Sequence, residues 1–521
     1  MASAAQPAPL PLRDVAALPV ANQPLLIVGV MLASLLQVLD TTIANVAIPH
    51  MQASLGATVD TVTWVLTSYI IASAVAMPIT GWLADRVGAR RLFIGAVAAF
   101  IATSALCGVA QNLEEMVLFR ALQGIAGAFI APLSQSFLLD SSKPSKHPQM
   151  MAIWGMGIMI GPILGPVLGG YLTEYWNWRF VFYVNVPVGI LALVILLATL
   201  PSRGQRRRSF DLFGFAAIAI GLSALQLLLD RGQQVGWFDA LEIWLYAGVF
   251  ASAVWVVIVH FATARNPLLE RALFADRNFV IALAFMLAIG MVLFANMALL
   301  PPMLQHLFGY SVIDTGLVLM PRGVGILISM QLAGLLTRKG VDARYLVTVG
   351  FLITAGSLWE MAGWSLAVDR FHIVMSGAIQ GLGIGLVFIP LQTVAFATLP
   401  PHLRTDGSSM LNLLRSVGSS IGISIATVML TRNTQTSHAD LAQHVTSATV
   451  NGFDLAQLDR FQTYGDTALT IADLEIQRQA AMIAYIDDYW MMMWMSLAAI
   501  PLVLLMRSNT GPSGSSGPPA H

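Results

Sequence analysis

The chain has 521 residues, of which 57% are hydrophobic and only 10% are charged, and its formal net charge is zero. A soluble domain carries about 25% charged residues, so this composition excludes a soluble globular protein and indicates an all-α polytopic membrane protein. The zero net charge argues against nucleic acid as a partner. Cys107 is the only cysteine, which excludes an intrachain disulfide and a cysteine-based metal site.

Fourteen apolar segments are long enough to span a bilayer, on the rule of about 20 residues for each helix. They lie near residues 25–48, 62–82, 92–110, 115–138, 150–171, 180–200, 212–229, 241–262, 279–304, 312–337, 345–364, 371–395, 408–430 and 489–506. We expect the first segment to be retained as a span, because no small-residue cleavage site closes it. Residues 1–24 are then a cytoplasmic N-terminal segment, and the Gly/Ser-rich residues 508–521 are a disordered tail.

The basic residues predict the orientation of these spans. Most of the 27 lysines and arginines fall in connections on the same side as the N-terminus, which the positive-inside rule places in the cytoplasm. An even number of spans then places both termini in the cytoplasm.

The chain repeats itself. Gln123-Gly124 and the following Pro132-Leu133 in the fourth span are matched by Gln380-Gly381 and Pro390-Leu391 in the twelfth, and the loop after the second span has a degenerate copy after the tenth. Span n therefore corresponds to span n + 8. The prediction is two six-helix bundles, residues 25–200 and 279–507, separated by residues 201–278, a basic linker with two inserted helices.

Two connections differ from the rest. The basic run 203–208 is interpreted as a topology anchor, with a lipid head-group site as the alternative. Residues 431–488 are predicted to be the only long outer loop, rich in acidic residues, with helical periodicity from Asp466 to Trp490. A loop of this length exceeds the usual 2–8 residues between bundle helices, and it is interpreted either as a docking surface or as a solvated cap.

The first span carries an aspartate, Asp40, at a depth where a charge costs about 2.5–3.5 kcal/mol. At helical spacing Gln37, Asp40 and Thr41 share one face. Arg120 in the fourth span lies at an overlapping depth, so gaining or losing this partner could load and unload a proton. The alternative is a buried aspartate that only bonds to a neighbouring helix.

The connection after the second span, Gly81 to Arg91, combines turn-forming glycines with charges. Gly81 and Gly88 permit a tight turn. The charged residues Asp85, Arg86 and Arg90 can pair across helix ends. We interpret this motif as a conformational latch, and simple positive-inside anchoring is the alternative.

The fifth span has a glycine at every fourth position, Gly157, Gly161, Gly165 and Gly169, with Pro162 and Pro166 between them. Such a stripe lets another helix approach closely. We interpret it as a seam that opens and closes between bundles, with plain helix packing as the alternative.

These motifs together resemble the major facilitator superfamily, and in particular its fourteen-spanner drug:proton antiporter family of EmrB-type multidrug efflux pumps. The segment Leu39 to Pro49 is similar to the first-helix motif of that family, Gly81 to Arg91 to the superfamily's signature loop, and Gly157 to Gly170 to its antiporter motif. The resemblance covers nearly the whole chain, including the region from Leu399 to Arg415.

The resemblance implies a function, a location and partners. The expected protein is a secondary transporter of a bacterial-type inner membrane that exports amphipathic small molecules by alternating access, driven by a proton gradient and without a cofactor or metal. A periplasmic adaptor and an outer-membrane channel are implied as partners, and nucleic acid is not. We assign seven polar residues to the substrate cavity: Gln37, Thr41, Asn45, Gln123, Gln380, Asn412 and Arg415.

Other classes are disfavoured. No lysine follows a glycine, so the phosphate-binding loop of a primary pump cannot form. The sequence also lacks His-Glu-x-x-His and Gly-x-Ser-x-Gly, which argues against an intramembrane enzyme. A major-facilitator exporter or symporter for one specific metabolite stays open as the alternative, because a fold does not set the coupling.

Overall fold

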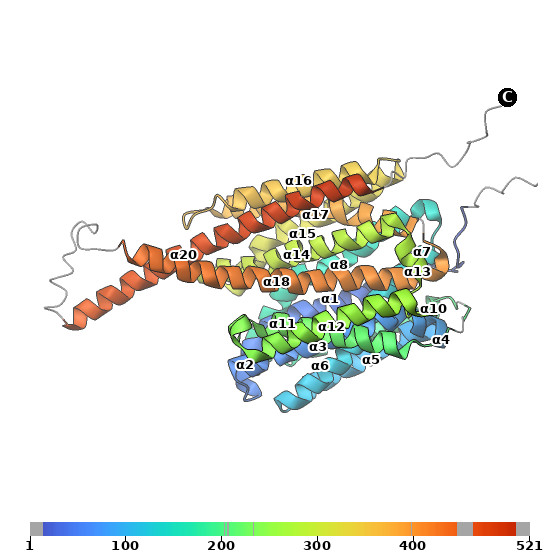
Figure 1. The fold of residues 1–521 in the computed structure, drawn as a ribbon, viewed down its shortest axis with the longest axis horizontal. Helices are drawn as coiled ribbons and strands as arrows, with labels where there is room; N and C mark the ends of the chain where they lie inside the picture. Colours follow the sequence, from blue (N-terminus) through green and yellow to red (C-terminus); the bar gives the residue numbers. More distant parts are fainter. Residues whose placement is uncertain are drawn as a thin grey trace, which may run out of the picture.

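The computed structural model describes residues 14–444 and 462–506, apart from residues 203, 206, 207, 233 and 398. The predicted disordered tail and most of the predicted N-terminal segment lie outside this range. The long helices run side by side along one axis (Figure 1). We call the end of the bundle with Gly88, between α4 and α5, the basic end, and the opposite end the far end.

The first half of the molecule contains the six predicted spans as helices, some of them divided. Their bounds are α1 (Gln23–Ser54), α2 (Val59–Val62), α3 (Trp64–Ala76), η1 (Met77–Ile79), α4 (Thr80–Val87), α5 (Ala89–Val109), α6 (Leu113–Ala128), α7 (Ile130–Asp140), η2 (Pro144–Lys146), α8 (His147–Tyr175), α9 (Phe180–Tyr183) and α10 (Asn185–Thr199).

Prolines explain where two of these spans divide. A proline clashes with the carbonyl four residues before it and lacks the N–H that would bond there. Pro132 accounts for the end of α6 at Ala128, and Pro187 accounts for the end of α9 at Tyr183.

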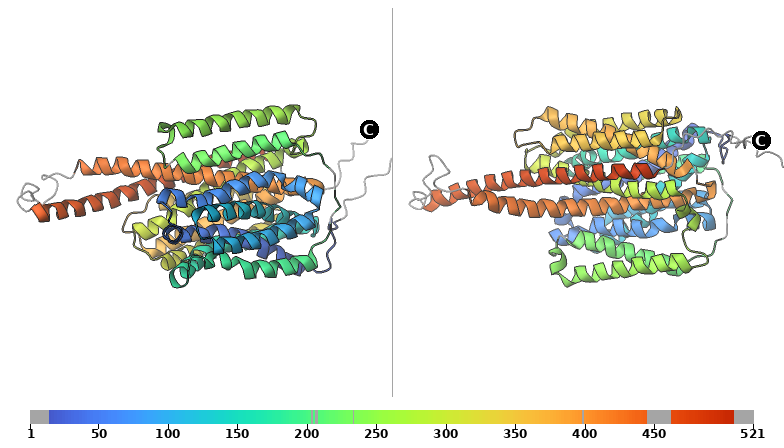
Figure 2. Two further views of the ribbon diagram at one scale, coloured as in Figure 1. Left: turned by 90° about the horizontal axis from the view of Figure 1, so that it is seen from below. Right: turned by 45° about the horizontal axis from the view of Figure 1, so that its top comes forward.

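The inserted pair consists of α11 (Leu212–Gly232) and α12 (Leu241–Thr263), with the short η3 (Trp237–Asp239) between them. α11 packs against α3 and α18 and so contacts both halves. α12 packs mainly against α11 and lies at the outer edge of the bundle (Figure 2). The pair is therefore an addition to the surface of the two halves.

The second half follows the same pattern as the first. Its elements are α13 (Arg271–Ala275), α14 (Arg277–His306), α15 (Val312–Arg338), α16 (Ala343–Met361), α17 (Arg370–Ala397), η4 (Pro401–Leu403), α18 (Arg404–Ala442), α20 (Gln462–Ala499) and η5 (Ile500–Leu505). Among the described residues, thirteen helices are long and apolar enough to cross a membrane. The 19-residue α16, packed against α17 and α20, corresponds to the eleventh predicted span, 345–364, and brings the total to fourteen. The all-helical fold class is confirmed.

The prediction of a long outer loop over residues 431–488 is wrong in its first part. α18 continues to Ala442, and α20 is helical from Gln462, as the periodicity from Asp466 predicts. The two helices project beyond the far end as a hairpin (Figures 1 and 2). No glycine or proline interrupts residues 431–442. Hydrogen bonds between the two helices also support the extension, from Asn433 to Asp487 at 3.1 Å and from His438 to Asp473 at 2.9 Å.

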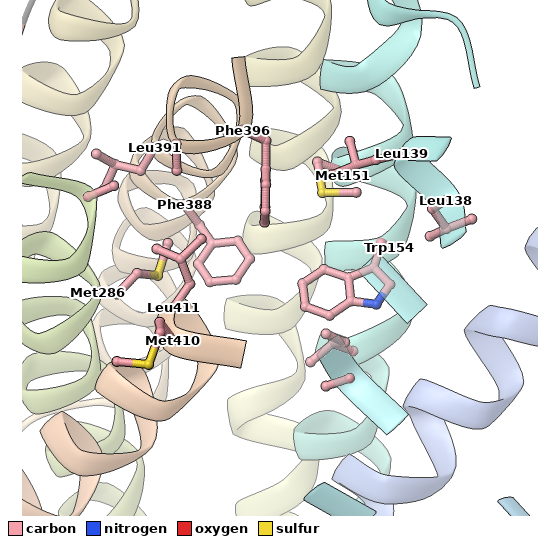
Figure 3. Packing of buried hydrophobic residues seen from close by; sticks show 14 of the residues in the cluster. Leu138, Leu139, Met151, Trp154, Met286, Phe388, Leu391, Phe396, Met410 and Leu411 are labelled. Carbon is pink, nitrogen blue, oxygen red and sulfur yellow. The ribbon is translucent and has the colours of Figure 1, made fainter. Parts of the chain in front are cut away.

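The largest hydrophobic core crosses between the halves. Figure 3 shows Met151 and Trp154 of α8 on one side, facing Phe388 and Phe396 of α17 on the other. All four side chains are almost fully buried. This packing holds the halves together around the points where polar residues meet.

Candidate functional site

Asp40 lies in the middle of α1 and is completely buried. Its Oδ2 accepts a hydrogen bond from Arg120 Nη1 on α6 at 2.6 Å, so the pair that the overlapping depths predict is formed. Arg120 is also fully buried, and its Nε donates to the carbonyl of Val65 on α3 at 3.1 Å. Three helices therefore converge on one ion pair.

Two amides complete the coordination of the carboxylate. Gln123 Nε2 donates to Asp40 Oδ1 at 2.9 Å, and Asn185 Nδ2 on α10 donates to the same oxygen at 2.7 Å. Both amides also bond to Ser104 Oγ on α5, at 2.8 and 3.0 Å. Gln123, assigned to the substrate cavity from the sequence, thus forms part of the Asp40 network.

Asn185 is a member of this network that the sequence analysis missed. It is fully buried within one of the most apolar spans. The rule that singles out Asp40, that an isolated polar side chain at depth has a purpose, would have found Asn185 if it had been applied to amides as well as acids.

Aromatic rings enclose the cation. The guanidinium carbon of Arg120 lies 4.4 Å from the centroid of Tyr69 and 5.6 Å from that of Phe182. Ring faces attract a cation, and they keep water away from it. In such surroundings, removing one partner of an ion pair is costly, because the other charge is left uncompensated. The centre can therefore respond to a single proton on Asp40.

The other predicted cavity residues make no hydrogen bond to Asp40 among the described residues. Thr41 is half-buried and bonds to the carbonyl of Val38, while Asn45 is exposed nearer the far end and Gln37 is half-buried. Gln380 is buried on α17, and its Oε1 has no hydrogen-bond partner among the described residues. The assignments thus mark separate places along the bundle.

Asn412 and Arg415 belong to a second polar group, which joins the halves. Asn412 Nδ2 donates to Gln135 Oε1 on α7 at 3.0 Å, and Gln135 Nε2 donates to Gln392 Oε1 on α17 at 2.8 Å. Ser408 also bonds to Gln135. Arg415 Nη2 donates to Asn412 Oδ1 at 3.0 Å. Gln135 and Gln392 occupy matching positions of the repeat, so this contact lies on the pseudo-symmetry axis of the halves.

At the basic end, Asp85 of the predicted latch pairs with an unexpected partner. Asp85 is paired with Arg208 of the inserted linker at 3.4 Å. The same Nη1 donates to Asp406 on the first turn of α18 at 2.9 Å, and Arg208 Nε lies 3.8 Å from Glu270. Arg208 therefore joins the first half, the second half and the segment that follows the inserted pair.

The environment of Arg208 favours its charge. Burial lowers the pKa of its guanidinium, but the carboxylates of Asp406, Glu270 and Asp85 outweigh that effect and hold the pKa above its ordinary value. Trp82 on α4 donates to the Arg208 carbonyl at 3.2 Å. The sequence analysis interpreted the basic run as a topology anchor or a lipid site, and neither interpretation predicted an ion-pair role for Arg208, its last residue. Arg203, Arg206 and Arg207 of the same run lie outside the described residues.

Gly81 explains how α4 and α18 come together. A β-carbon built at Gly81 would overlap the carboxylate of Asp406, so only glycine lets that side chain reach Arg208. Gly88 ends α4 with φ +100°, which favours glycine. Arg86 is exposed, and Arg90 donates to the carbonyl of Leu197 at 2.9 Å. Neither arginine forms an ion pair with Asp85 in the described part of the chain.

A second ion pair closes the same end. Arg404 Nη1, two residues before Asp406, donates to Asp140 at the end of α7 at 2.7 Å. Ser136 and Thr405 bond one another beside it at 2.9 Å. The first turn of α18 is thus held by charges from α7 and from the linker, and the basic end is shut between the halves.

The glycine stripe of α8 lies against α1. A β-carbon at Gly161 would meet the backbone nitrogen of Leu39 at 3.0 Å, and one at Gly165 or Gly169 would crowd Thr42 or Ile43. Gly157 faces Met31 in the same way. Thr42 Oγ1, two residues after Asp40, donates to the Gly161 carbonyl at 3.2 Å.

The opposite face of α8 packs against α15 of the second half. Ile163 and Val167 fill the space above Gly323 and Gly316 of α15. Pro162 and Pro166 lie within α8, which remains one continuous helix. α8 therefore connects the helix that carries Asp40 to the other half of the molecule, as a seam between them would require.

Comparisons with known proteins agree with this architecture. The family model described as Major Facilitator Superfamily matches residues 30–423. The chain is 35% identical over 494 residues to the multidrug export protein EmrB of Escherichia coli strain K12, covering 94% of this chain and 96% of that protein. It is 34% identical over 425 residues to the fatty acid resistance protein FarB of Neisseria gonorrhoeae, covering 81% and 83%.

A solved structure shares the fold at low sequence identity. The proton:xylose symporter XylE superposes with a TM-score of 0.59 at 15% identity, over 92% of this chain and 94% of that one. At this level of identity the similarity concerns the fold alone.

Proposed function

The chain belongs to the major facilitator superfamily, and we propose that within it this protein is a proton-coupled exporter of amphipathic compounds, including drugs, that works by alternating access. The similarity to multidrug export proteins over nearly the full chain supports export. The observation that carries the coupling is the buried ion pair of Asp40 and Arg120 at 2.6 Å. The proposed location is a bacterial-type inner membrane.

The proposed cycle uses the charge balance at Asp40. A proton that reaches Asp40 from the far end neutralises the carboxylate and releases Arg120 from its counter-charge. Asp40 of this pair lies on α1. α1 packs on the glycine face of α8, and α8 in turn packs on the second half. Loss of the attraction can therefore change how the halves pack, and release of the proton at the basic end restores the pair.

The closed basic end supplies the second conformational element. The contacts of Arg208 with Asp85 and Asp406, together with the pair of Arg404 and Asp140, must break before substrate can enter from that side. The structure thus corresponds to a conformer with its basic end shut. Population of the other conformer requires a differential interaction with the proton or with the substrate.

Dye efflux from proteoliposomes with an imposed pH gradient tests the proposal. Asp40→Asn keeps the size of the side chain and cannot release a proton, so we expect loss of gradient-driven efflux with the protein still folded. Asp239→Asn, at an exposed acid in the turn between α11 and α12, is the matched control and should transport normally. Normal efflux by Asp40→Asn would remove the residue from the coupling mechanism.

The same vesicles distinguish the alternative, an exporter or symporter for one specific metabolite. A multidrug exporter should accept several amphipathic dyes of unrelated structure and move them opposite to the proton. Transport of a single compound, or movement in the same direction as the proton, would favour the alternative.

We also propose that the hairpin of α18 and α20 docks a periplasmic adaptor that leads to an outer-membrane channel. The hairpin projects past the other helices, and two apolar side chains of α20 on one face, Ile471 and Leu474, are about 60% exposed. Exposed apolar groups on a projecting element are typical of an interaction site.

Paired substitution of both apolar residues tests this part of the proposal. Ile471→Ser with Leu474→Ser should abolish adaptor co-purification and cellular resistance, yet leave efflux from proteoliposomes intact. Gln477→Ser, at an exposed polar position on the same helix, is the control. Retained co-purification of the double variant would exclude this face as the docking site.

A further inference from the structure

The repeat places a second polar centre in the second half. Gly124 of α6 lies against the backbone carbonyl of Tyr69, and its counterpart Gly381 of α17 lies against the backbone carbonyl of Arg322. Arg322 on α15 therefore occupies the position that Tyr69 holds on α3. In the first half this position supplies a ring under the cation, and in the second half it supplies the cation itself.

The second centre repeats the geometry of the first with a different partner. Arg322 Nη1 donates to Asn296 Oδ1 on α14 at 2.7 Å, which parallels the 2.6 Å contact of Arg120 with Asp40. An amide thus stands on the counterpart of α1 where an acid stands in the first half. Nε and Nη2 of the buried Arg322 have no hydrogen-bond partner among the described residues, and a buried guanidinium with no counter-charge is costly.

The second half also contains an acid that the mechanism has not used. Asp488 on α20 is completely buried, and neither of its oxygens has a hydrogen-bond partner in the described part of the chain. α20 is the counterpart of the span that carries Asn185, the amide bonded to Asp40. In the first half the acid, Asp40, is on α1 and the amide, Asn185, is on α10. In the second half the corresponding helices carry them the other way round, with the amide on α14 and the acid on α20.

Tyr489 is a neighbour of both Asp488 and Arg322. It is buried and close enough to both Asp488 and Arg322 to interact with each electrostatically. Its hydroxyl donates to the Met303 sulfur of α14 at 3.1 Å, and its ring packs at 5.9 Å from that of Trp364, which follows α16. These two neighbours of Tyr489 carry no charge.

The remaining groups near Asp488 also lack a cation. On α20 itself the ionisable neighbours are Tyr485, which is neutral, and Asp487, whose charge opposes a negative charge on Asp488. α18 contributes Asn433, and this amide is bonded to Asp487 at 3.1 Å. A carboxylate without a counter-charge or a hydrogen-bond donor is strongly disfavoured in such a place, whereas the neutral acid is tolerated.

We propose that Asp488 is a second proton-binding carboxyl, which carries its proton in this conformation, and that Arg322 is the buried cation that it pairs with once the proton has left. The step is a simple ionisation, in which the carboxyl O–H bond breaks, the electron pair stays on the oxygen and the proton passes to water. The role of this step in transport rests on the proposed function, but the protonation of Asp488 does not.

Carbodiimide labelling tests the protonation directly. Dicyclohexylcarbodiimide is apolar and reacts with protonated carboxyls in apolar surroundings, so at neutral pH we expect mass spectrometry to find adducts on Asp488 and none on Asp40, whose oxygens face Arg120 and two amides. Asp487→Asn, beside the target, should keep the label. In Arg322→Gln the label should persist to higher pH, because the ionised form loses its counter-charge. Absence of label on Asp488, while other carboxyls react, would overturn the proposal.

Proton counting tests the function of the site. Substrate added to detergent-solubilised protein with a pH indicator should release fewer protons from Asp40→Asn and none from Asp40→Asn with Asp488→Asn. Equal release from the single and double variants would show that Asp488 has no part in coupling. If Asp40→Asn transports normally, the proposed function fails, while the labelling result still decides the state of Asp488.

Discussion

The fit between α4 and α18 at Gly81 predicts that one methyl group will open the basic end. In Gly81→Ala the new β-carbon overlaps the carboxylate of Asp406, which is buried and holds Arg208 at 2.9 Å. The carboxylate cannot move away without losing that bond. The first turn of α18 must therefore separate from α4, or the side chain must turn away from the arginine.

The magnitude follows from the cost of overpacking a close contact, about 1–3 kcal/mol. This cost arises only when the two elements touch, so it is a free-energy difference between the closed and the open conformer. A coupling of this size shifts the equilibrium by roughly 5- to 150-fold toward the open basic end. Alanine also favours helix by up to about 1 kcal/mol over glycine, which acts in both conformers.

A single reporter cysteine measures the shift. Cys107→Ser removes the native thiol, and Ser136→Cys introduces one where Thr405 now covers α7 at 2.9 Å. In the parent this cysteine is buried and should react slowly with a permeant maleimide, whereas Gly81→Ala should raise the rate within the range given above.

Gly95→Ala is the matched control, because a β-carbon at Gly95 of α5 meets nothing within 4 Å. It changes helix propensity without any clash and should leave the labelling rate unchanged. If Gly81→Ala labels at the parent rate and transports normally, the contact with Asp406 does not govern closure, and the reasoning is refuted.

Three further predictions follow from other contacts. Arg208→Gln removes the charge that joins the halves to the linker and leaves Asp406 buried without a cation; we expect faster labelling of the same reporter cysteine, and unchanged labelling would limit the arginine to anchoring. Gly165→Val places two methyl groups against Thr42 of α1. The overpacking costs about 1–3 kcal/mol, so the variant should lose several degrees of thermal midpoint and should no longer support efflux. A variant of parental stability would show that α1 and α8 are not tightly apposed. Asn185→Leu removes one hydrogen-bond donor to Asp40, and a charge-assisted hydrogen bond contributes about 1.5–3 kcal/mol. The pH at which efflux is fastest should therefore change. An unchanged pH profile of efflux would show that the amide is a packing residue only.

The sequence alone was sufficient for the helices and for the ion pair at Asp40. Spans are recognisable because the length and hydropathy of a segment are local properties, and they correctly predicted fourteen helical spans, although α18 and α20 extend well beyond the predicted bounds at the far end. Asp40 and Arg120 were paired from their depths in two spans, because charges in an apolar medium require partners and few were available. The packing of the glycine stripe could be predicted for the same local reason, although not which helix it would meet.

Only the tertiary structure decided which groups meet across long sequence separations. Asp85 pairs with Arg208 and not with Arg86 or Arg90, because Arg208 of the inserted linker contacts both α4 and α18, and nothing local to Gly81 or Arg208 specifies that placement. The extension of α18 to Ala442 was missed because polar residues lower its hydropathy, while α20 beside it supports the helix. The exposure of a carboxylate is likewise a property of the packed bundle: Asp488 was counted with an acidic outer loop, and the packing of α20 in the second half buried it completely.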